Sequence, residues 1–508
     1  MAATVGSALN WWAKTKGDHV AIRLGADQLT YRELDQWTSR VARRLADEGV
    51  KPGDRVGLLS PNVLQWPVIA LAILKTGALL VPFNSRLKAA EIRKIADESG
   101  MTAMVAAPNQ VPAAEQARNL GRDFMLLEFA TIDELRDGDP DDYRAHRGIE
   151  DPIAVIFTSG STGLSKGVIL TNQTLLGIVL ENTLTEEGFH PGTVTLLVLP
   201  LAFTPGLVYG LLATTVLGGT LIIEPDLNAS RAVKLIEEHK VRALFGVPVI
   251  FESLSRAPEF ESADLSSLQT AIVGGAAVPS DLLRRWADKN VLLRQIYGMT
   301  EAGGVATATL KAEALDHPDS CGSGSIFTEV CVMNDDGSLA EPGQQGELVV
   351  RGPGVTPGYW NDPESTAAAI RDGWLRSGDL GVGDGEGRIT FVDRLKDLII
   401  SGGINISPVE LEATIGTLDG VEEVAVIAAP DPRWGETPAA IITVSEGSEG
   451  LDEAAVIAHC ENQLSDYKVP RYVVLRSDPL PRLPSGKIAK RVIREEYCDI
   501  TERFAKAR

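Results

Sequence analysis

The chain has 508 residues, of which 44% are hydrophobic and 23% charged, which is typical of a folded protein but too long for a single hydrophobic core. Its 69 acidic and 48 basic side chains give a formal net charge of −21. This charge disfavours binding to a phosphate backbone, so we expect more than one domain and no nucleic-acid partner.

The cysteines and the apolar stretches indicate the compartment. The four cysteines form no CxxC pair and have no zinc-like spacing, and the first residues lack a signal-peptide pattern, so we expect reduced thiols and a cytoplasmic protein. Residues 193–223 carry no charge, but prolines and glycines interrupt them. We interpret this stretch as buried core and substrate wall, and expect no membrane span.

The first elements alternate between helices and strands. Thr30 and Glu33 fit a capping box, and apolar residues at helical spacing follow until Gly49. Further helices are expected over 67–77 and 88–98. Short apolar runs indicate strands at 55–60, 78–84, 101–107, 153–158, 195–201, 220–225, 242–248 and 270–276. The alternation predicts an α/β fold of layered βαβ sheets.

Beyond Asp393 the elements become shorter and more acidic. A helix is expected after Ser407 and Pro408, strands at 421–430 and 438–445, and a terminal helix after Lys487. We predict a large N-terminal domain over 1–393, a hinge over 394–397, and a small mobile α+β C-terminal domain over 398–508.

A glycine-rich loop directly follows the strand expected at 153–158. Small hydroxyl residues and glycines leave backbone N–H groups accessible, and Lys166 adds a cation, so the loop suits a polyphosphate. The spacing around the lysine does not fit a Walker A loop, which excludes that class of nucleotide hydrolase. The loop residues expected to bind nucleotide are Thr158, Ser159, Gly160, Ser161, Thr162, Gly163 and Lys166.

This loop and five further motifs, in matching order, resemble the adenylate-forming superfamily of acyl-CoA synthetases, luciferases and peptide-synthetase adenylation domains. Ser165 stands where that family usually has proline. The resemblance covers nearly the whole chain. It implies ATP and coenzyme A as co-substrates, Mg²⁺ as cofactor, and a carboxylic acid that is activated as an acyl-adenylate.

The resemblance also implies roles for individual residues. Thr300 contacts the α-phosphate, Glu301 holds Mg²⁺, and Lys487 reaches the carboxylate and the α-phosphate, so these three and Lys166 form the catalytic set. Lys396 is the hinge residue. Further ATP-binding residues are Gly274, Gly275, Ala276, Tyr297, Gly298, Asp379 and Arg394, and Ser401, Gly402 and Gly403 line the coenzyme A tunnel.

The acid itself is the least determined part. Phe203 stands where many acyl-CoA synthetases have histidine, and residues 193–223 contain no aspartate that would pair with an amino acid. We therefore expect a hydrophobic aryl, alicyclic or fatty acid. The residues expected to line its pocket are Phe203, Phe245, Val247, Met299, Gly303 and Gly304.

The predicted function is an AMP-forming acid–thiol ligase that makes acyl-CoA. Four alternatives stay open: an adenylating enzyme that loads a carrier protein, one that stops at the adenylate, a luciferase-like oxygenase, and a non-catalytic relative that acts as a binding protein. The partners expected are small molecules, and a homodimer is left open.

Overall fold

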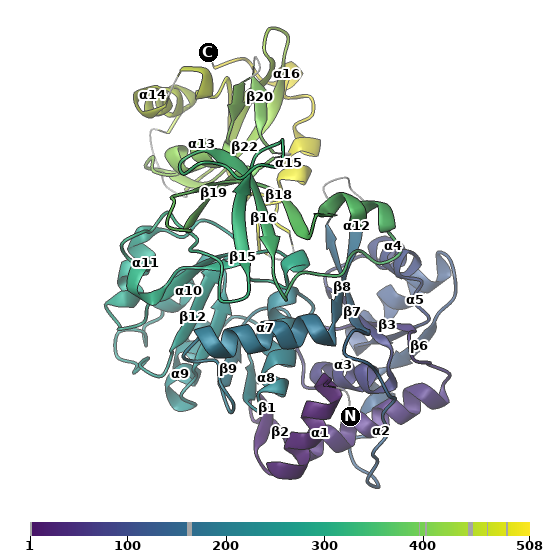
Figure 1. Cartoon of the computed structure of the whole chain (residues 1–508). Helices are drawn as coiled ribbons and strands as arrows, with labels where there is room; N and C mark the ends of the chain where they lie inside the picture. The colour runs from purple at the N-terminus through teal and green to yellow at the C-terminus, as the bar shows by residue number, and fades with distance from the viewer. Residues whose placement is uncertain are drawn as a thin grey trace. The chain divides into compact units, whose positions relative to one another are not determined.

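The computed structural model describes residues 3–159, 165–395, 397–401, 404–445, 451–464, 466–483 and 486–507. The chain forms two compact units (Figure 1). Unit 1 comprises Met1–Cys331, Val349–Arg376 and Gly387–Ile389, and unit 2 comprises Val332–Leu348, Ser377–Glu386 and Thr390–Arg508. The α/β class with a separate C-terminal part is confirmed, whereas the hinge and the domain limits expected above stay predictions.

An eight-stranded sheet forms one layer of unit 1. Its strands from β13 to β1 run parallel to their neighbours, and the edge strands β14 and β2 are antiparallel. The order is β14 (Thr307–Ala308), β13 (Leu293–Tyr297), β12 (Thr270–Gly274), β11 (Ala243–Gly246), β9 (Val194–Leu197), β10 (Thr220–Ile223), β1 (Val20–Leu24) and β2 (Asp27–Thr30).

A six-stranded sheet forms a second layer of unit 1. Its strands are parallel except for the edge hairpin of the last two. The order is β6 (Met125–Glu128), β5 (Ala103–Ala106), β3 (Arg55–Leu59), β4 (Leu79–Phe83), β7 (Pro152–Ser159) and β8 (Ser165–Thr171). Such buried parallel strands account for the near-continuous apolar runs in the sequence.

Helices connect and cover these strands, and α7 is the long helix at the front of unit 1 in Figure 1. The predicted capping box is confirmed, because the Thr30 hydroxyl accepts a hydrogen bond from the Glu33 N–H at the start of α2. The helices of unit 1 are α1 (Val5–Thr15), α2 (Tyr31–Asp47), α3 (Gln65–Thr76), α4 (Ala89–Ser99), α5 (Val111–Asn119), α6 (Phe129–Asp133), α7 (Asn172–Thr185), α8 (Ala213–Val216), α9 (Ala229–Glu238), α10 (Pro248–Ser255), α11 (Ser280–Ala287) and α12 (Pro363–Ala369). Short 3₁₀ turns are η1 (Pro108–Gln110), η3 (Thr300–Ala302) and η4 (Lys311–Glu313).

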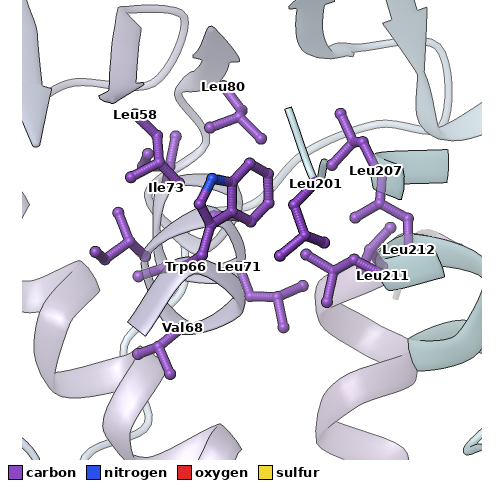
Figure 2. Packing of buried hydrophobic residues seen from close by; sticks show 14 of the residues in the cluster. Leu58, Trp66, Val68, Leu71, Ile73, Leu80, Leu201, Leu207, Leu211 and Leu212 are labelled. Atoms are coloured by element: carbon purple, nitrogen blue, oxygen red, sulfur yellow. The ribbon is translucent and has the colours of Figure 1, made fainter. Parts of the chain in front are cut away.

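The largest hydrophobic cluster includes residues from both sheets of unit 1. Trp66 on α3 is fully buried, and Figure 2 shows it among leucines from α3, from the strands and from the segment after β9. A fully buried side chain of this kind contributes about 2–3 kcal/mol relative to exposure. This packing joins the helix beside the six-stranded sheet to the segment that is expected to form the substrate wall.

The charge-free stretch over 193–223 is buried, as the sequence predicts. Between β9 and β10 in the chain, residues Pro205–Leu212 form an eight-residue π-helix, η2, which continues into α8. The sequence does not reveal this helix, because Pro205 and Gly206 at its start resemble strand breakers. Among the described residues, no helix is long and apolar enough to cross a membrane.

A five-stranded sheet contains the points where the chain passes between the units. It has the order β15 (Glu329–Met333), β16 (Gln345–Arg351), β18 (Trp374–Gly383) and β17 (Ile370–Arg371), with β19 (Ile389–Arg394) paired to β18.

The rest of unit 2 is α+β, as predicted. Its five-stranded sheet has the order β21 (Ile404–Ile406), β20 (Ile399–Ser401), β23 (Gly435–Val444) and β22 (Val421–Asp431), with β24 (Tyr472–Arg476) paired to β23. Its helices are α13 (Pro408–Ile415), α14 (Glu453–Gln463), α15 (Lys490–Glu496), α16 (Ile500–Arg503) and the 3₁₀ turn η5 (Asp466–Lys468).

Candidate active site

Several predicted site residues lie at the carboxyl ends of the parallel strands of the eight-stranded sheet. Strands β9, β11, β12 and β13 are parallel neighbours, so their carboxyl ends lie side by side. The predicted acyl-pocket residues Phe245 and Val247, the predicted ATP-binding residues 274–276 and the segment 297–301 lie at the ends of β11, β12 and β13. Ligands of open parallel sheets bind at such edges, so the topology supports grouping these motifs in one site.

Two glycines allow the backbone of this site to fold tightly. A Cβ atom on Gly298 would lie 1.9 Å from the carbonyl oxygen of Gly304, so no side chain fits there. Gly304 has a φ of +111°, and a Cβ atom on it would lie 2.7 Å from the Tyr209 ring. The chain after β13 can therefore form a tight turn around Thr300 and Glu301, which we call the Thr-Glu turn, only because Gly298 and Gly304 carry no side chain.

The two motif residues at this turn each contact a side chain from outside the motif. The Thr300 and Thr204 hydroxyl oxygens lie 2.9 Å apart, and Thr204 directly precedes the π-helix η2. Glu301 is buried, at 9% exposure, and its Oε1 accepts a hydrogen bond of 3.1 Å from the Tyr359 hydroxyl. Burial raises the pKa of the Tyr359 hydroxyl far above its usual value, and the neighbouring Glu301 carboxylate raises it further. The tyrosine is therefore a neutral hydrogen-bond donor.

The described residues of the predicted phosphate loop belong to the paired strands β7 and β8. Thr158 and Lys166 face each other in its register. Lys166 places its ammonium 4.9 Å from the centre of the Tyr359 ring. Four of the predicted loop residues, Gly160 to Gly163, lie outside the described residues, so their part in nucleotide binding stays a prediction.

Sequence reasoning missed Tyr359, which contacts two of the predicted catalytic residues. It forms an isolated bridge with Val168 of β8, and the Trp360 N–H donates to the Gly167 carbonyl at 2.7 Å. The Thr356 N–H donates to the Glu301 carbonyl at 2.8 Å. The 356–360 segment therefore joins β8 to the Thr-Glu turn. The one signal in the sequence is a Tyr-Trp pair directly after Pro357-Gly358.

Two of the predicted acyl-pocket residues, Phe245 and Gly304, lie against the ring of Tyr209. The rings of Phe245 and Tyr209 lie 4.9 Å apart, and Tyr209 comes from the π-helix η2. Phe203 is half-buried just before that helix, whereas Val247 and Met299 are partly exposed at the ends of β11 and β13. An apolar, uncharged wall at the same edge as the Thr-Glu turn suits a hydrophobic acid.

Unit 2 holds the other predicted nucleotide residues. Asp379 is buried, at 8% exposure, and its Oδ1 lies 3.6 Å from Nε of Arg394. Lys487 is exposed, yet desolvation by the protein around its ammonium lowers its pKa, repulsion from Arg394 lowers it further, and Asp379 opposes both. Ser401 ends β20. Lys396, Gly402 and Gly403 lie outside the described residues.

The side chains at this site suit a metal ion that is bound partly by substrate phosphates better than one bound by protein ligands alone. No group of three or more histidine, cysteine, aspartate or glutamate side chains suited to a metal occurs in the described part of the chain. Mg²⁺ in nucleotide enzymes typically takes one or two carboxylates and completes its shell with phosphates and water. A single buried carboxylate such as Glu301, oriented by a hydroxyl, fits that pattern.

Comparison with known proteins agrees with this arrangement. The family model of AMP-binding enzymes matches residues 9–360, and that of the AMP-binding enzyme C-terminal domain matches residues 410–487. The chain therefore belongs to the AMP-binding enzyme family. Within it, the chain is an AMP-forming acid–thiol ligase of the acyl-CoA synthetase type, as the resemblance predicts.

The relatives are similar over nearly their whole length. A feruloyl-CoA synthase from Amycolatopsis is 38% identical over 477 residues, covering 94% of this chain and 96% of the relative. A long-chain-fatty-acid–CoA ligase from Mycobacterium tuberculosis is 34% identical, covering 92% and 93%. The solved structure of ATP-bound MatB from Rhodopseudomonas palustris superposes with a TM-score of 0.88 at 29% identity, covering 98% of this chain and 100% of that one.

Proposed function

We propose that the chain activates a hydrophobic aryl, alicyclic or fatty acid and transfers its acyl group to coenzyme A. The observation that supports the choice of acid is the contact between the Tyr209 and Phe245 rings, because Tyr209 belongs to the π-helix η2 and Thr204, directly before that helix, contacts Thr300. Burying apolar substrate surface there gains about 25 cal/mol per Å². The names of the feruloyl and long-chain relatives agree with an apolar acid.

The first half-reaction needs positioning and charge neutralisation more than covalent chemistry by the protein. A carboxylate oxygen of the acid bonds to the α-phosphorus of ATP, and the bond from that phosphorus to the pyrophosphate oxygen breaks. The Thr300 hydroxyl would donate to the α-phosphate, and the Lys166 and Lys487 ammonium groups would offset negative charge. Glu301 would hold Mg²⁺, which supplies further charge neutralisation when bound.

In the second half-reaction the thiol of coenzyme A attacks the acyl carbonyl. The carbon–sulfur bond forms, the carbon–oxygen bond to AMP breaks, and the thiol proton leaves to solvent. Ser401, Gly402 and Gly403 are the residues proposed to border the pantetheine arm. Asp379 and Arg394 are proposed to hold the ribose, because a carboxylate can accept hydrogen bonds from two hydroxyls at once.

A carboxylic-acid panel tests the choice of acid. Pyrophosphate release would be measured with ferulic, long-chain fatty, alicyclic and short polar acids, each with coenzyme A and with a phosphopantetheine carrier protein as acceptor. We expect release with apolar acids and thioester formation on coenzyme A. Preference for polar acids would refute the proposed substrate class, and transfer only to the carrier would identify the alternative ligase. No release with any acid would indicate a binding protein.

The division of labour within unit 2 is a second part of the proposal. Lys487 would serve adenylation, whereas the 401–403 segment would serve the thiol step, with rotation about Lys396 between them. Lys487→Ala should lower adenylate formation by about 100-fold or more, while thioester formation from preformed acyl-adenylate stays near the wild-type rate. Equal loss of both half-reactions would contradict this division. Lys396→Pro should slow the thiol step selectively.

The remaining expectations concern the cell and the assembly. We propose a cytoplasmic location because Cys321, Cys331, Cys460 and Cys498 are all free thiols. A homodimer stays an open prediction, to be checked by light scattering at micromolar concentration.

A further inference from the structure

One tyrosine side chain contacts two charged residues of the proposed phosphate site. The Tyr359 hydroxyl donates to Oε1 of Glu301 at 3.1 Å, and the face of its ring lies 4.9 Å from Nζ of Lys166. A tyrosine suits both contacts because its hydroxyl is a donor and its ring face attracts cations. Tyr359 therefore holds an anion and a cation on different parts of one side chain.

Tyr359 is itself held from several directions. Its N–H donates to the Thr366 hydroxyl at 2.9 Å, and the bridge to Val168 aligns it with β8. On its N-terminal side, the Thr356 N–H donates to the backbone carbonyl of Glu301 at 2.8 Å. This hydrogen bond links the backbone segments that carry the tyrosine and the glutamate. Groups that are fixed on both sides in this way have little freedom left to lose when ligand binds.

The chemistry at Glu301 explains why such an arrangement is needed. A buried carboxylate that takes up a divalent cation must present an oxygen to the metal, and a hydrogen bond to its other oxygen orients it. If Lys166 paired directly with Glu301, each charge would be neutralised before the nucleotide arrived. A ring face attracts an ammonium but offers it no acceptor atom, so the contact with Tyr359 itself uses none of the N–H donors of Lys166.

We propose that Tyr359 is a positioning residue for the nucleotide: its hydroxyl orients the Glu301 carboxylate toward the divalent cation on ATP, and its ring holds Lys166 beside the phosphates. The inference rests on the proposed function in one respect, the binding of a cation by Glu301. It assigns Tyr359 no part in bond making.

Two substitutions separate the hydroxyl from the ring. Tyr359→Phe keeps the ring and removes the donor, and Tyr359→Leu removes both. Tyr467→Phe is the matched control, because Tyr467 is 43% exposed and lies in unit 2. Each variant would first be checked for unchanged circular dichroism and thermal unfolding, so that only folded protein is compared.

The decisive measurement is metal binding without turnover. Mn²⁺ is titrated by electron paramagnetic resonance into protein saturated with a nonhydrolysable ATP analogue, and binding of the analogue alone is measured in EDTA by calorimetry. We expect Tyr359→Phe to weaken Mn²⁺ binding about tenfold and to leave metal-free binding of the analogue within twofold of wild type. Tyr359→Leu should in addition weaken metal-free binding about two- to fivefold. Tyr467→Phe should match wild type in both.

Several results would overturn the inference. Mn²⁺ affinity of Tyr359→Phe within twofold of wild type would show that the hydroxyl does not orient the metal carboxylate. Equal weakening of metal-bound and metal-free nucleotide would indicate a purely structural role. The outcome is separable from the proposed function, because a wild-type protein that binds Mn²⁺ with the analogue but releases no pyrophosphate with apolar acids would refute only the proposed substrate class.

Discussion

Two charged clusters of unit 1 use lysine and acid in opposite ways. In the first, which we call the closed cluster, Lys75 donates to the Asp35 carbonyl at 2.8 Å, to Asp35 Oδ1 at 2.7 Å and to the Ser39 hydroxyl at 2.8 Å. An ammonium has three protons, so all of its donors are used inside the protein. These contacts tie α3 to α2.

The second cluster, which we call the open cluster, consists of Lys166, Glu301 and Tyr359. Here the cation lies against a ring and the acid accepts a hydrogen bond from a hydroxyl. Lys166 lies near the start of β8, and Glu301 lies in the turn η3 after β13. The difference teaches that a buried charge alone does not indicate function. A lysine whose donors are all satisfied internally serves the fold, whereas contact with a ring face uses none of the N–H donors of a lysine.

Glu301→Gln should break the open cluster with the largest effect. The amide keeps the shape and the acceptor for Tyr359 but loses the charge for a divalent cation. We expect adenylation, measured as acid-dependent ATP–pyrophosphate exchange, to fall about 10²–10³-fold in kcat/KM, with little change in the free energy of unfolding. Glu364→Gln, an exposed change on α12, is the control. A large loss of stability would place Glu301 with the structural charges instead.

Lys75→Met should have the complementary effect. Removing one partner of a buried ion pair leaves the other unpaired and costs about 3–5 kcal/mol of stability. We expect about 3 kcal/mol, because the Asp35 side chain keeps 10% exposure. Denaturant unfolding measures this, and Lys51→Met, an exposed lysine, is the control. Activity per folded molecule should stay unchanged, and a selective loss of activity would undo the contrast between the clusters.

Much of this arrangement follows from local signals in the sequence. The capping box at Thr30 and the apolar runs predict α2 and the parallel strands, and once strands are parallel neighbours their ends must converge. The grouping of the motifs at 274–276 and 297–301 came instead from the family resemblance, because no strand was expected over β13 (Leu293–Tyr297).

The parts that escaped prediction depend on contacts between distant residues. Tyr359 lies 58 positions from Glu301, and no periodicity links the two. The π-helix η2 depends on tertiary packing of an apolar run whose proline and glycine favour a break. The Thr204–Thr300 contact depends on that helix, so sequence reasoning placed Phe203 in the pocket but saw no role for its neighbour.

The pH profile of adenylation tests whether Lys487 belongs with the open cluster. Its lowered pKa means that the ammonium is lost at lower pH than for an ordinary lysine, so adenylation should decline on the alkaline side at lower pH than an ordinary lysine would cause. Lys487→Arg stays charged and should remove this decline, even if its absolute rate is lower. Pyrophosphate exchange between pH 7 and pH 10 measures both. The same alkaline limb in the arginine variant would exclude Lys487 as its source.

Titration of Lys75 does not destabilise the folded protein at alkaline pH, so it would not cause a decline of adenylation there. Burial lowers the pKa of Lys75 to about 8, below its ordinary value of 10.5. The unfolded chain therefore binds more protons at this lysine between these values, and its contribution to stability rises as the pH rises.

Thr204→Val should have the smallest effect, and it tests whether the acyl wall and the open cluster are coupled. Valine keeps the β-branched shape but cannot hydrogen-bond to Thr300, and one such bond contributes about 1 kcal/mol, or about fivefold in rate. We expect kcat for adenylation to fall about fivefold, with the KM for the acid and the thiol step unchanged. Thr204→Ser retains the hydroxyl and should stay within twofold of wild type. If serine slows the reaction while valine stays within twofold of wild type, the methyl group and its packing matter instead of the hydrogen bond to Thr300.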